Sequence, residues 1–336
     1  MKKLLTLLPL ATLALVGCAG LLKTGEEFTP IDNTKTVNVG ILQPVEHVAL
    51  KAASDGFQAA IKEAGLDNVK FNYRNAGGND ADLNMLAKNL VDDCDMSLGI
   101  GTGAAKALLA AEKNAGYKKP LLFTAVTDPV GAGLVQSADN PKGFVCGTTD
   151  ANPVEAQIDL VKEFKPDAQK VGIVYTQTEE NSKVQSDQAE AAIKVAGMTS
   201  LVRTCNNSSD IKTAVDALIS SNVDAIYVPT DNNIAANMNI IKQATNLSHT
   251  LVVCGEENML AAGGHITLSI DYTALGRAAG EMAAKIIKGE SKPTDFKVEA
   301  VPAENCTYVY SSANLSGAGL TMPESMLSGH DWKDVA

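Results

Sequence analysis

Two segments of the chain combine residue types that suit the recognition of a small charged solute. Gly101-Thr102-Gly103-Ala104 follows a short apolar run, and glycines at such a turn let backbone N–H groups approach a carboxylate at the start of a helix. Asp231 follows the corresponding run later in the chain, where its carboxylate could pair with an ammonium group. The structural alternative is that Thr102 and Asp231 only cap the helices that follow them.

The other candidate ligand contacts fall in loops, most of them where a predicted strand ends. They are Gln43, Glu46, His47, Thr127, Asp128, Asp150, Asn181, Ser182, Thr230, Asn232, Glu256, Asn258 and Asp271. Several have a structural alternative: Glu46 could cap a helix, and Asp128 could stiffen the turn before Pro129. We expect Glu256 and Asn258 to decide which ligand is chosen.

The same residue types give little support for catalysis. The chain has four histidines, and neither a G-x-S-x-G nor an H-E-x-x-H motif occurs. Adjacent carboxylates such as Asp92-Asp93 diverge on regular structure instead of converging. No CxxC or CxxH motif suggests a structural zinc site, and the glycines make no full dinucleotide fingerprint. We therefore expect no metal and no cofactor, and an exported two-lobed enzyme is the least favoured function.

The candidate residues are positioned by a pattern that occurs twice. Val39-Gly40-Ile41-Leu42-Gln43 returns as Val171-Gly172-Ile173-Val174-Tyr175, and residues 95–102 return as 224–231. Each copy alternates short β-branched runs with Ala-rich helical stretches, which is typical of a parallel sheet covered by helices. Because α/β sheets bind ligands at the carboxyl ends of their strands, two such lobes predict a binding cleft between them.

The predicted fold is α/β, with two Rossmann-like lobes joined by a multi-strand hinge. We expect strands at 37–43, 69–73, 96–100, 121–125, 144–148, 171–175, 199–204, 224–228, 251–254, 266–270 and 307–311. We expect helices at 48–64, 81–91, 154–164, 183–196, 210–220, 232–245, 256–261 and 272–288, and one that starts after Gly101. Lobe 1 would comprise residues 36–148 plus 272–297, and lobe 2 residues 149–271 plus 298–336. Several crossings between lobes allow a cleft to close on a ligand.

The N-terminal segment resembles an export signal. Met1-Lys2-Lys3 is basic, and Leu4 to Val16 is an apolar stretch, interrupted by Pro9, that is too short to span a bilayer. Small residues before Cys18 match a bacterial lipobox, so residues 1–18 would be a signal peptide whose Cys18 is lipidated. Residues 19–35 would form a flexible leader. The alternative is an ordinary signal peptide with a chance cysteine. We expect an exported protein, lipid-anchored at Cys18 to the membrane of the cell envelope.

Composition and net charge limit the classes of molecule that the chain could bind. The chain of 336 residues suits two domains, and its net charge of −11, without a basic patch, argues against nucleic acid. Besides Cys18 there are five cysteines, an odd number, so at least one lacks a partner within the chain. They are Cys94, Cys146, Cys205, Cys254 and Cys306, and their spacing assigns no pairing. Two of them lie in apolar runs, which favours buried thiols.

Several segments resemble the solute-binding lipoproteins of a group of ABC importers. The matching segments are Gly40–Gln43 with Glu46-His47, residues 123–132, Asp150-Ala151-Asn152-Pro153, Glu180-Asn181-Ser182, residues 228–232 and residues 319–325. The resemblance runs from Thr36 to about Leu327 and is closest to the tryptophan-binding lipoproteins. It implies a type I periplasmic-binding-protein (Venus-flytrap) fold and a monomer that delivers a small-molecule solute to an ABC permease.

The chain departs from the tryptophan-binding pattern in two places. Residues 255–259 contain two carboxylates where those members carry small and hydroxyl residues, and the turn at Gly101 has Gly-Thr-Gly in place of Ala-Thr-Pro. Aromatic residues make up 4% of the chain. We therefore expect an amino-acid ligand, with an aromatic amino acid as one option, and keep a nucleoside or sugar receptor on the same fold as the alternative. A ligand-sensing regulator would need a DNA-binding segment where the signal peptide stands.

Overall fold

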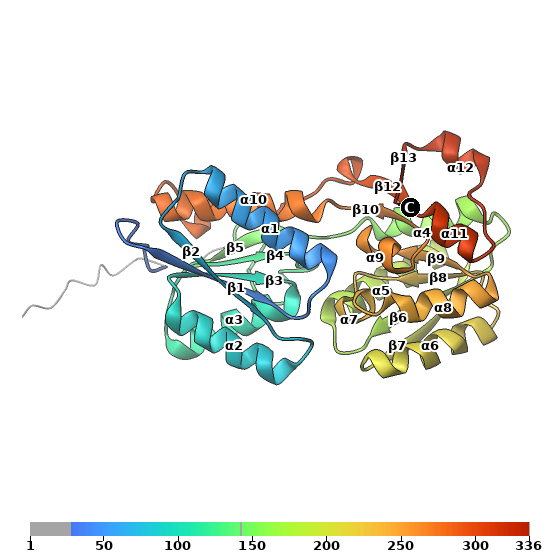
Figure 1. The fold of residues 1–336 in the computed structure, drawn as a ribbon, viewed down its shortest axis with the longest axis horizontal. Helices are drawn as coiled ribbons and strands as arrows, with labels where there is room; N and C mark the ends of the chain where they lie inside the picture. The colour runs from blue at the N-terminus through green and yellow to red at the C-terminus, as the bar shows by residue number, and fades with distance from the viewer. Residues whose placement is uncertain (1–27, 142, 336) are drawn as a thin grey trace, which may run out of the picture.

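The computed structural model describes residues 28–141 and 143–335 and arranges them as two α/β lobes side by side (Figure 1). The expected signal peptide with Cys18, and residues 19–27 of the expected leader, lie outside the described residues. Among the described residues, no helix combines the length and apolar composition needed to cross a bilayer. The expected α/β class with two lobes is confirmed.

Lobe 1 is built on a parallel sheet whose strands lie in the order β11-β5-β4-β3-β1-β2. The strands are β1 (Val37–Gln43), β2 (Val69–Asn75), β3 (Met96–Ile100), β4 (Leu121–Thr124), β5 (Val145–Thr149) and β11 (Glu299–Ala300). The helices are α1 (Val48–Glu63), α2 (Asp80–Asp93), α3 (Thr102–Ala115) and α10 (Tyr272–Lys288). One buried apolar cluster joins α1 and α10 to the sheet and another joins α2 and α3 to it, so both faces are covered.

Lobe 2 has a seven-stranded sheet in the order β13-β12-β10-β9-β8-β6-β7. Its strands are β6 (Lys170–Thr176), β7 (Thr199–Cys205), β8 (Ala225–Val228), β9 (Leu251–Cys254), β10 (Ile266–Ser269), β12 (Thr307–Tyr310) and β13 (Trp332–Asp334). All neighbours are parallel except β10 and β12. Its helices are α4 (Val154–Phe164), α5 (Glu180–Val195), α6 (Ser208–Ser220), α7 (Asn232–Ala235), α8 (Met238–Ser248), α9 (Asn258–Ala262), α11 (Ser312–Gly317) and α12 (Glu324–Gly329). Two 3-10 turns, η1 (Pro293–Asp295) and η2 (Ala303–Asn305), lie between α10 and β12.

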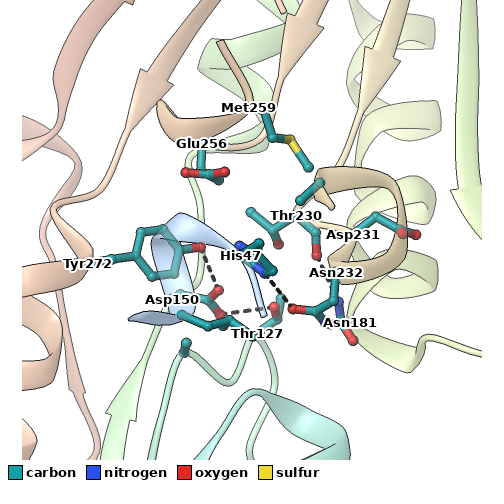
Figure 2. A pocket seen from close by; sticks show the side chains of 13 residues that line it. His47, Thr127, Asp150, Asn181, Thr230, Asp231, Asn232, Glu256, Met259 and Tyr272 are labelled. Atoms are coloured by element: carbon teal, nitrogen blue, oxygen red, sulfur yellow. Dashed lines mark hydrogen bonds between the residues drawn. The ribbon is translucent and has the colours of Figure 1, made fainter. Parts of the chain in front are cut away.

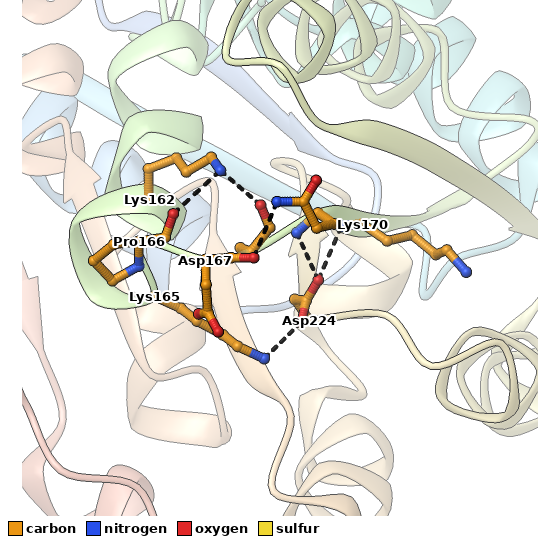
Figure 3. Close-up of polar contacts among 8 residues, drawn as sticks. Lys162, Lys165, Pro166, Asp167, Lys170 and Asp224 are labelled. Atoms are coloured by element: carbon orange, nitrogen blue, oxygen red, sulfur yellow. Dashed lines mark hydrogen bonds and ion pairs between the residues drawn. The ribbon is translucent and has the colours of Figure 1, made fainter.

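The sequence repeat has a matching structural device in each lobe. In lobe 1, Asp95 accepts a hydrogen bond from the backbone N–H of Asn38, at the start of β1 (2.8 Å). In lobe 2, the equivalent Asp224 accepts one from the N–H of Lys170, at the start of β6 (2.9 Å), and pairs with Lys165 (Figure 3). Each aspartate therefore ties the turn before the third strand of its lobe to the beginning of the first.

The two lobes are linked by three crossings, at residues 150–153, 270–271 and 301–306. β11, just before the third crossing, pairs with β5 in the sheet of lobe 1. After the second crossing, α10 lies against α1 so closely that a Cβ on Gly276 would stand 1.9 Å from the carbonyl oxygen of Ala53. This contact fixes α10 in lobe 1, although the strand before it belongs to lobe 2.

One expected helix was wrong, and four short elements, β11, α11, α12 and β13, were not expected. The helix expected over 232–245 is divided into α7 and α8, because Asn237 has a non-helical backbone (φ −128°, ψ 21°) and its side chain donates to the carbonyl of Asn233. β13 was not expected at all. It is a three-residue edge strand beside β12, and so short a segment has too little alternation to be recognised in sequence.

Candidate ligand-binding site

A cavity lies between the lobes, where the carboxyl ends of their strands face one another (Figure 2). Its enclosed volume is about 20 Å³, and about 310 Å³ of space is free of protein atoms when the adjoining open solvent is included. The lining residues come from both lobes and are His47, Leu50, Ala125, Thr127, Asp150, Asn181, Thr230, Asp231, Asn232, Ala235, Glu256, Met259 and Tyr272. Eight of them are among the residues that we predicted from the sequence, and they are brought together here from six separate segments of the chain.

Asp150 is the buried carboxylate at the hinge. Its two oxygens accept hydrogen bonds from Oγ1 of Thr127 (3.0 Å) and from the hydroxyl of Tyr272 (2.8 Å). Burial raises the pKa of Asp150, and the two hydroxyl donors oppose that rise. The side chain therefore connects the end of β4, the first crossing and the start of α10, and it holds the hinge side of the cavity in place.

Asp231 is the buried carboxylate of lobe 2. It accepts from the backbone N–H (2.6 Å) and Oγ1 (2.8 Å) of Thr176 and from the N–H of Ile234 (2.9 Å). The last contact is the N-cap of α7. Of the two roles considered from the sequence, capping is therefore the one for which the structure supplies the partners. Ser182 is buried beside it and also donates to it.

Glu179 was missed by the sequence reasoning. Its carboxylate accepts from the backbone N–H (2.9 Å) and side-chain amide (2.6 Å) of Asn232 and from the N–H of Asn233 (2.9 Å). Burial and the neighbouring Asp231 carboxylate raise the pKa of Glu179 to about 8. In the sequence, only position distinguishes Glu179 from the exposed Glu180, so no local pattern could have identified it.

Two polar contacts cross the cleft and hold the lobes together. Nε2 of His47 in lobe 1 lies 3.1 Å from Oδ1 of Asn232 in lobe 2. Nζ of Lys106 on α3 lies 2.5 Å from Oε1 of Glu180 on α5. Because each contact needs both lobes in register, the structure represents a closed arrangement of the cleft.

Glu256 supplies a carboxylate that is only half satisfied. The side chain is 2% exposed, and its Oε2 accepts from the backbone N–H (2.7 Å) and side-chain amide (2.9 Å) of Asn258. Its Oε1 is buried without a hydrogen-bond partner. Burial raises the pKa of Glu256 to about 7. Asn258 therefore orients Glu256 and does not itself line the cavity.

Some predicted residues lie outside the cavity because their side chains are used elsewhere. Gln43 is buried and donates to the carbonyl of Val45 (2.8 Å). Glu46 is exposed and accepts from Asn75 at the end of β2 (3.0 Å). Asp271 is exposed and caps α10. None of these three side chains lines the cavity, so as ligand contacts they stay predictions.

The turn at the start of α3 also lies outside the cavity. Gly101 and Ala104 are buried, whereas Thr102 and Gly103 line a wider groove along the cleft, next to Lys106. Oγ1 of Thr102 is buried without a partner. Asp128 lines a neighbouring groove and accepts from the N–H of Gly131 (2.8 Å), as a turn-stiffening residue does.

The remaining lining residues had no signal in the sequence. Tyr272 was expected only as a helix start, and no role was predicted for Leu50, Ala235 or Met259. Ala125 has a left-handed backbone conformation (φ 54°), which an alanine in the sequence does not indicate. Within the described ranges, no group of three or more His, Cys, Asp or Glu side chains is arranged to hold a metal. The five described cysteines are free thiols.

Comparisons of sequence and structure relate this chain to known substrate-binding proteins. A sequence model of the family "ABC transporter substrate binding protein" matches residues 38–331. The tyrosine-binding protein of Clostridioides difficile is 35% identical over 264 residues, which cover 77% of this chain and 75% of that protein. An ABC domain from Streptococcus pneumonia in complex with L-Trp is 31% identical and superposes with a TM-score of 0.82, covering 90% of this chain and 100% of that chain.

A third relative bears on the closed arrangement. The ligand-free, open structure of an adhesive substrate-binding protein from Clostridium difficile is 30% identical and covers 89% of this chain and 100% of that chain. Its TM-score is 0.66, although its identity is nearly that of the L-Trp complex. The lobes of this chain are thus placed more like those of the ligand-bound relative, in agreement with the two contacts across the cleft.

Proposed function

Because this chain belongs to the family of ABC transporter substrate-binding proteins, we propose that it is the extracytoplasmic receptor of an ABC importer. It binds an amino acid in the cavity between its lobes and delivers it to the permease. The observation that carries the proposal is the buried polar cavity, which both lobes line and which two contacts across the cleft close. Asp150 and Asp231 already accept hydrogen bonds from the protein, so these two carboxylates hold the site in shape. This supports a binding role over a catalytic one.

An amino acid is the ligand class best supported. The cavity offers polar groups beside a small apolar wall of Leu50, Ala235 and Met259, which suits a solute with one charged end and one apolar end. Relatives named for tyrosine and tryptophan make an aromatic side chain the first choice. A sugar or nucleoside receptor would need rings to stack on, and Tyr272 is the sole phenyl-type ring in the lining, tied by its hydroxyl to Asp150.

The residues proposed to contact ligand are those that line the cavity, with Thr102 and Gly103 at the adjoining groove. Lobe 1 supplies His47 and Thr127, and lobe 2 supplies Thr230 and the groups around Glu256. Ligand binding then stabilises the closed form, since only closure brings the two halves together. The permease would distinguish the loaded from the empty receptor by this difference in lobe arrangement.

Anchoring at Cys18 is part of the same proposal. A lipid chain on Cys18 would keep a monomeric receptor near its permease, and residues 19–35 would serve as the tether. Cys18→Ser is expected to move the protein from the membrane fraction to the soluble extracytoplasmic fraction without loss of ligand binding. Retention of Cys18→Ser in the membrane fraction would contradict the anchor.

Thermal unfolding of residues 19–336 with the twenty amino acids, nucleosides and simple sugars tests the ligand class. A ligand at 1,000 times its dissociation constant adds about 4 kcal/mol to the free energy of unfolding, a shift that is easily measured. A response to one or a few amino acids is expected. A response confined to sugars or nucleosides would keep the receptor and overturn the ligand class, and silence throughout would overturn both.

A further inference from the structure

Two buried hydrogen-bond acceptors in the cavity have no partner, and they come from different lobes. They are Oε1 of Glu256 and Nδ1 of His47. We propose that these two atoms hold a primary ammonium group of the ligand, so that the receptor selects amines. This inference rests on the proposed function and adds to it the chemical group that is recognised and the residues that recognise it.

Glu256 meets the requirements of a cation-binding group. Its Oε2 is fixed by two hydrogen bonds from Asn258, so the carboxylate cannot turn to satisfy Oε1 without losing them. A buried oxygen of this kind is costly to leave unpaired. Figure 2 shows Glu256 facing the space that His47 and Tyr272 also face. A donor supplied by the ligand would therefore remove an existing penalty.

The tautomer of His47 is set by a relay of two side chains. The amide nitrogen of Asn232 donates to Glu179 (2.6 Å), so the amide oxygen of Asn232 faces His47. Because a carbonyl oxygen only accepts, Nε2 of His47 must carry the hydrogen of this contact (3.1 Å). Burial lowers the pKa of His47, so the ring is neutral at pH 7 and Nδ1 presents a lone pair. Glu179 thus acts on the ligand indirectly, as a positioning residue.

Among the residues that line the cavity, no cationic side chain competes with the ligand's ammonium group for these two acceptors. The lining contains neither Lys nor Arg, and the nearby Lys106 pairs with Glu180 outside it. The other two lining carboxylates, Asp150 and Asp231, already accept hydrogen bonds from the protein. Among the charged side chains of the lining, Glu256 therefore has an unpaired acceptor and no Lys or Arg is present to pair with it. An ammonium group has three donors and can bridge the two lobes.

The decisive experiment is titration calorimetry with matched ligands. L-tyrosine and L-tryptophan are compared with their deaminated acids, 3-(4-hydroxyphenyl)propionate and indole-3-propionate, and the remaining amino acids, tyramine, tryptamine, simple sugars and nucleosides complete the panel. We expect binding only from compounds with a primary amine. A deaminated acid that binds as tightly as its amino acid would overturn the proposal.

Glu256→Gln tests the carboxylate with nearly unchanged shape. It should weaken binding of the amine ligand at least thirtyfold, because an uncharged amide replaces the charged acceptor. Glu112→Gln is the matched control: Glu112 is also fully buried with one unpartnered oxygen, but it lies on α3 away from the cavity and should leave affinity unchanged. His47→Phe removes Nδ1 and should weaken the same ligand at least tenfold.

The outcomes separate the two proposals. Parent affinity in folded Glu256→Gln would overturn the ammonium site while leaving the amino-acid receptor in place. Binding of a sugar or nucleoside without any amine would also overturn the ammonium site and leave only the receptor. No binding by any compound, with the protein folded, would overturn both. Circular dichroism of each variant establishes that it is folded.

Discussion

Glu256→Gln is expected to make the ligand-free protein more stable at pH 8. The parent carries a buried carboxyl whose pKa is raised to about 7 from an ordinary value of 4.5. Between these two values the folded protein keeps a proton that the unfolded chain releases, so stability falls as the pH rises through this range. Glutamine does not ionise and removes this loss.

The size of the effect follows from the same two values. The interval between pKa 4.5 and about 7 corresponds to about 3 kcal/mol in the free energy of unfolding. The variant should match the parent near pH 4.5 and exceed it by about that amount at pH 8. Glu112 and Glu179, whose pKa values are raised to about 7 and about 8, give the same sign of slope in both proteins and cancel in the difference.

Urea unfolding at a series of pH values measures this difference. The chain has a single tryptophan, Trp332, and it lies on β13 in the same lobe as Glu256, so its fluorescence reports on the relevant lobe. Glu324→Gln is the control, since Glu324 is exposed on α12 in the same lobe and its substitution should follow the parent.

Parallel pH profiles for the parent and Glu256→Gln would refute the reasoning. They would mean that Glu256 is hydrated in the ligand-free protein and loses no free energy on ionising. The groups around the carboxylate could change its titration as well, and they are Asp150, Tyr272, Cys254 and Glu257. Because all are present in both proteins, none can produce a difference between the profiles unless Glu256 itself titrates.

Three further results are expected. The affinity for an amine ligand should rise between pH 6 and pH 8, because Glu256 ionises in this range and the cation favours the ionised form; calorimetry that shows no pH dependence would count against it. Gly276→Ala should cost about 2–3 kcal/mol in urea unfolding, because the new Cβ would overlap the Ala53 carbonyl and separate α1 from α10; parent stability would contradict this packing. Lys106→Ala should change ligand affinity less than about fivefold, since the Lys106–Glu180 pair is largely exposed, and a larger loss by calorimetry would show a direct role.

The fold was predictable because its signals are local and repeated. The strand around Gly40 and its copy around Gly172 are short apolar runs, each followed by a helix with an apolar face, and that alternation permits few topologies. The Asp95 and Asp224 contacts occupy equivalent positions in the two copies, so the sequence repeat corresponds to a structural one. What failed was the continuity of the helix at Asn237 and the edge strand β13, where a single side chain or one neighbouring strand decides the outcome.

The site was predictable only in outline. The strand-end rule located Asp150, Asp231 and Glu256 near one another, because parallel strands present their carboxyl ends at one edge. It could not say which carboxylate is satisfied, since this depends on partners distant in sequence, such as Tyr272 for Asp150. Glu179 is the clearest case: its role depends on four amide donors that meet only after lobe 2 has folded.

In the proposed site, the contact of the ligand's ammonium group with Glu256 and His47 both selects the ligand and stabilises the closed cleft. Glu256 lies in lobe 2 and His47 in lobe 1, so an ammonium group can contact both only when the cleft is closed. A solute without the group would leave Oε1 of Glu256 unpaired in the closed form and would therefore favour the open one. The free energy that the unpaired Glu256 oxygen costs the closed form at neutral pH is then what discriminates between ligands, because only an amine recovers it on closure. The carboxylate thereby makes closure depend on the right ligand.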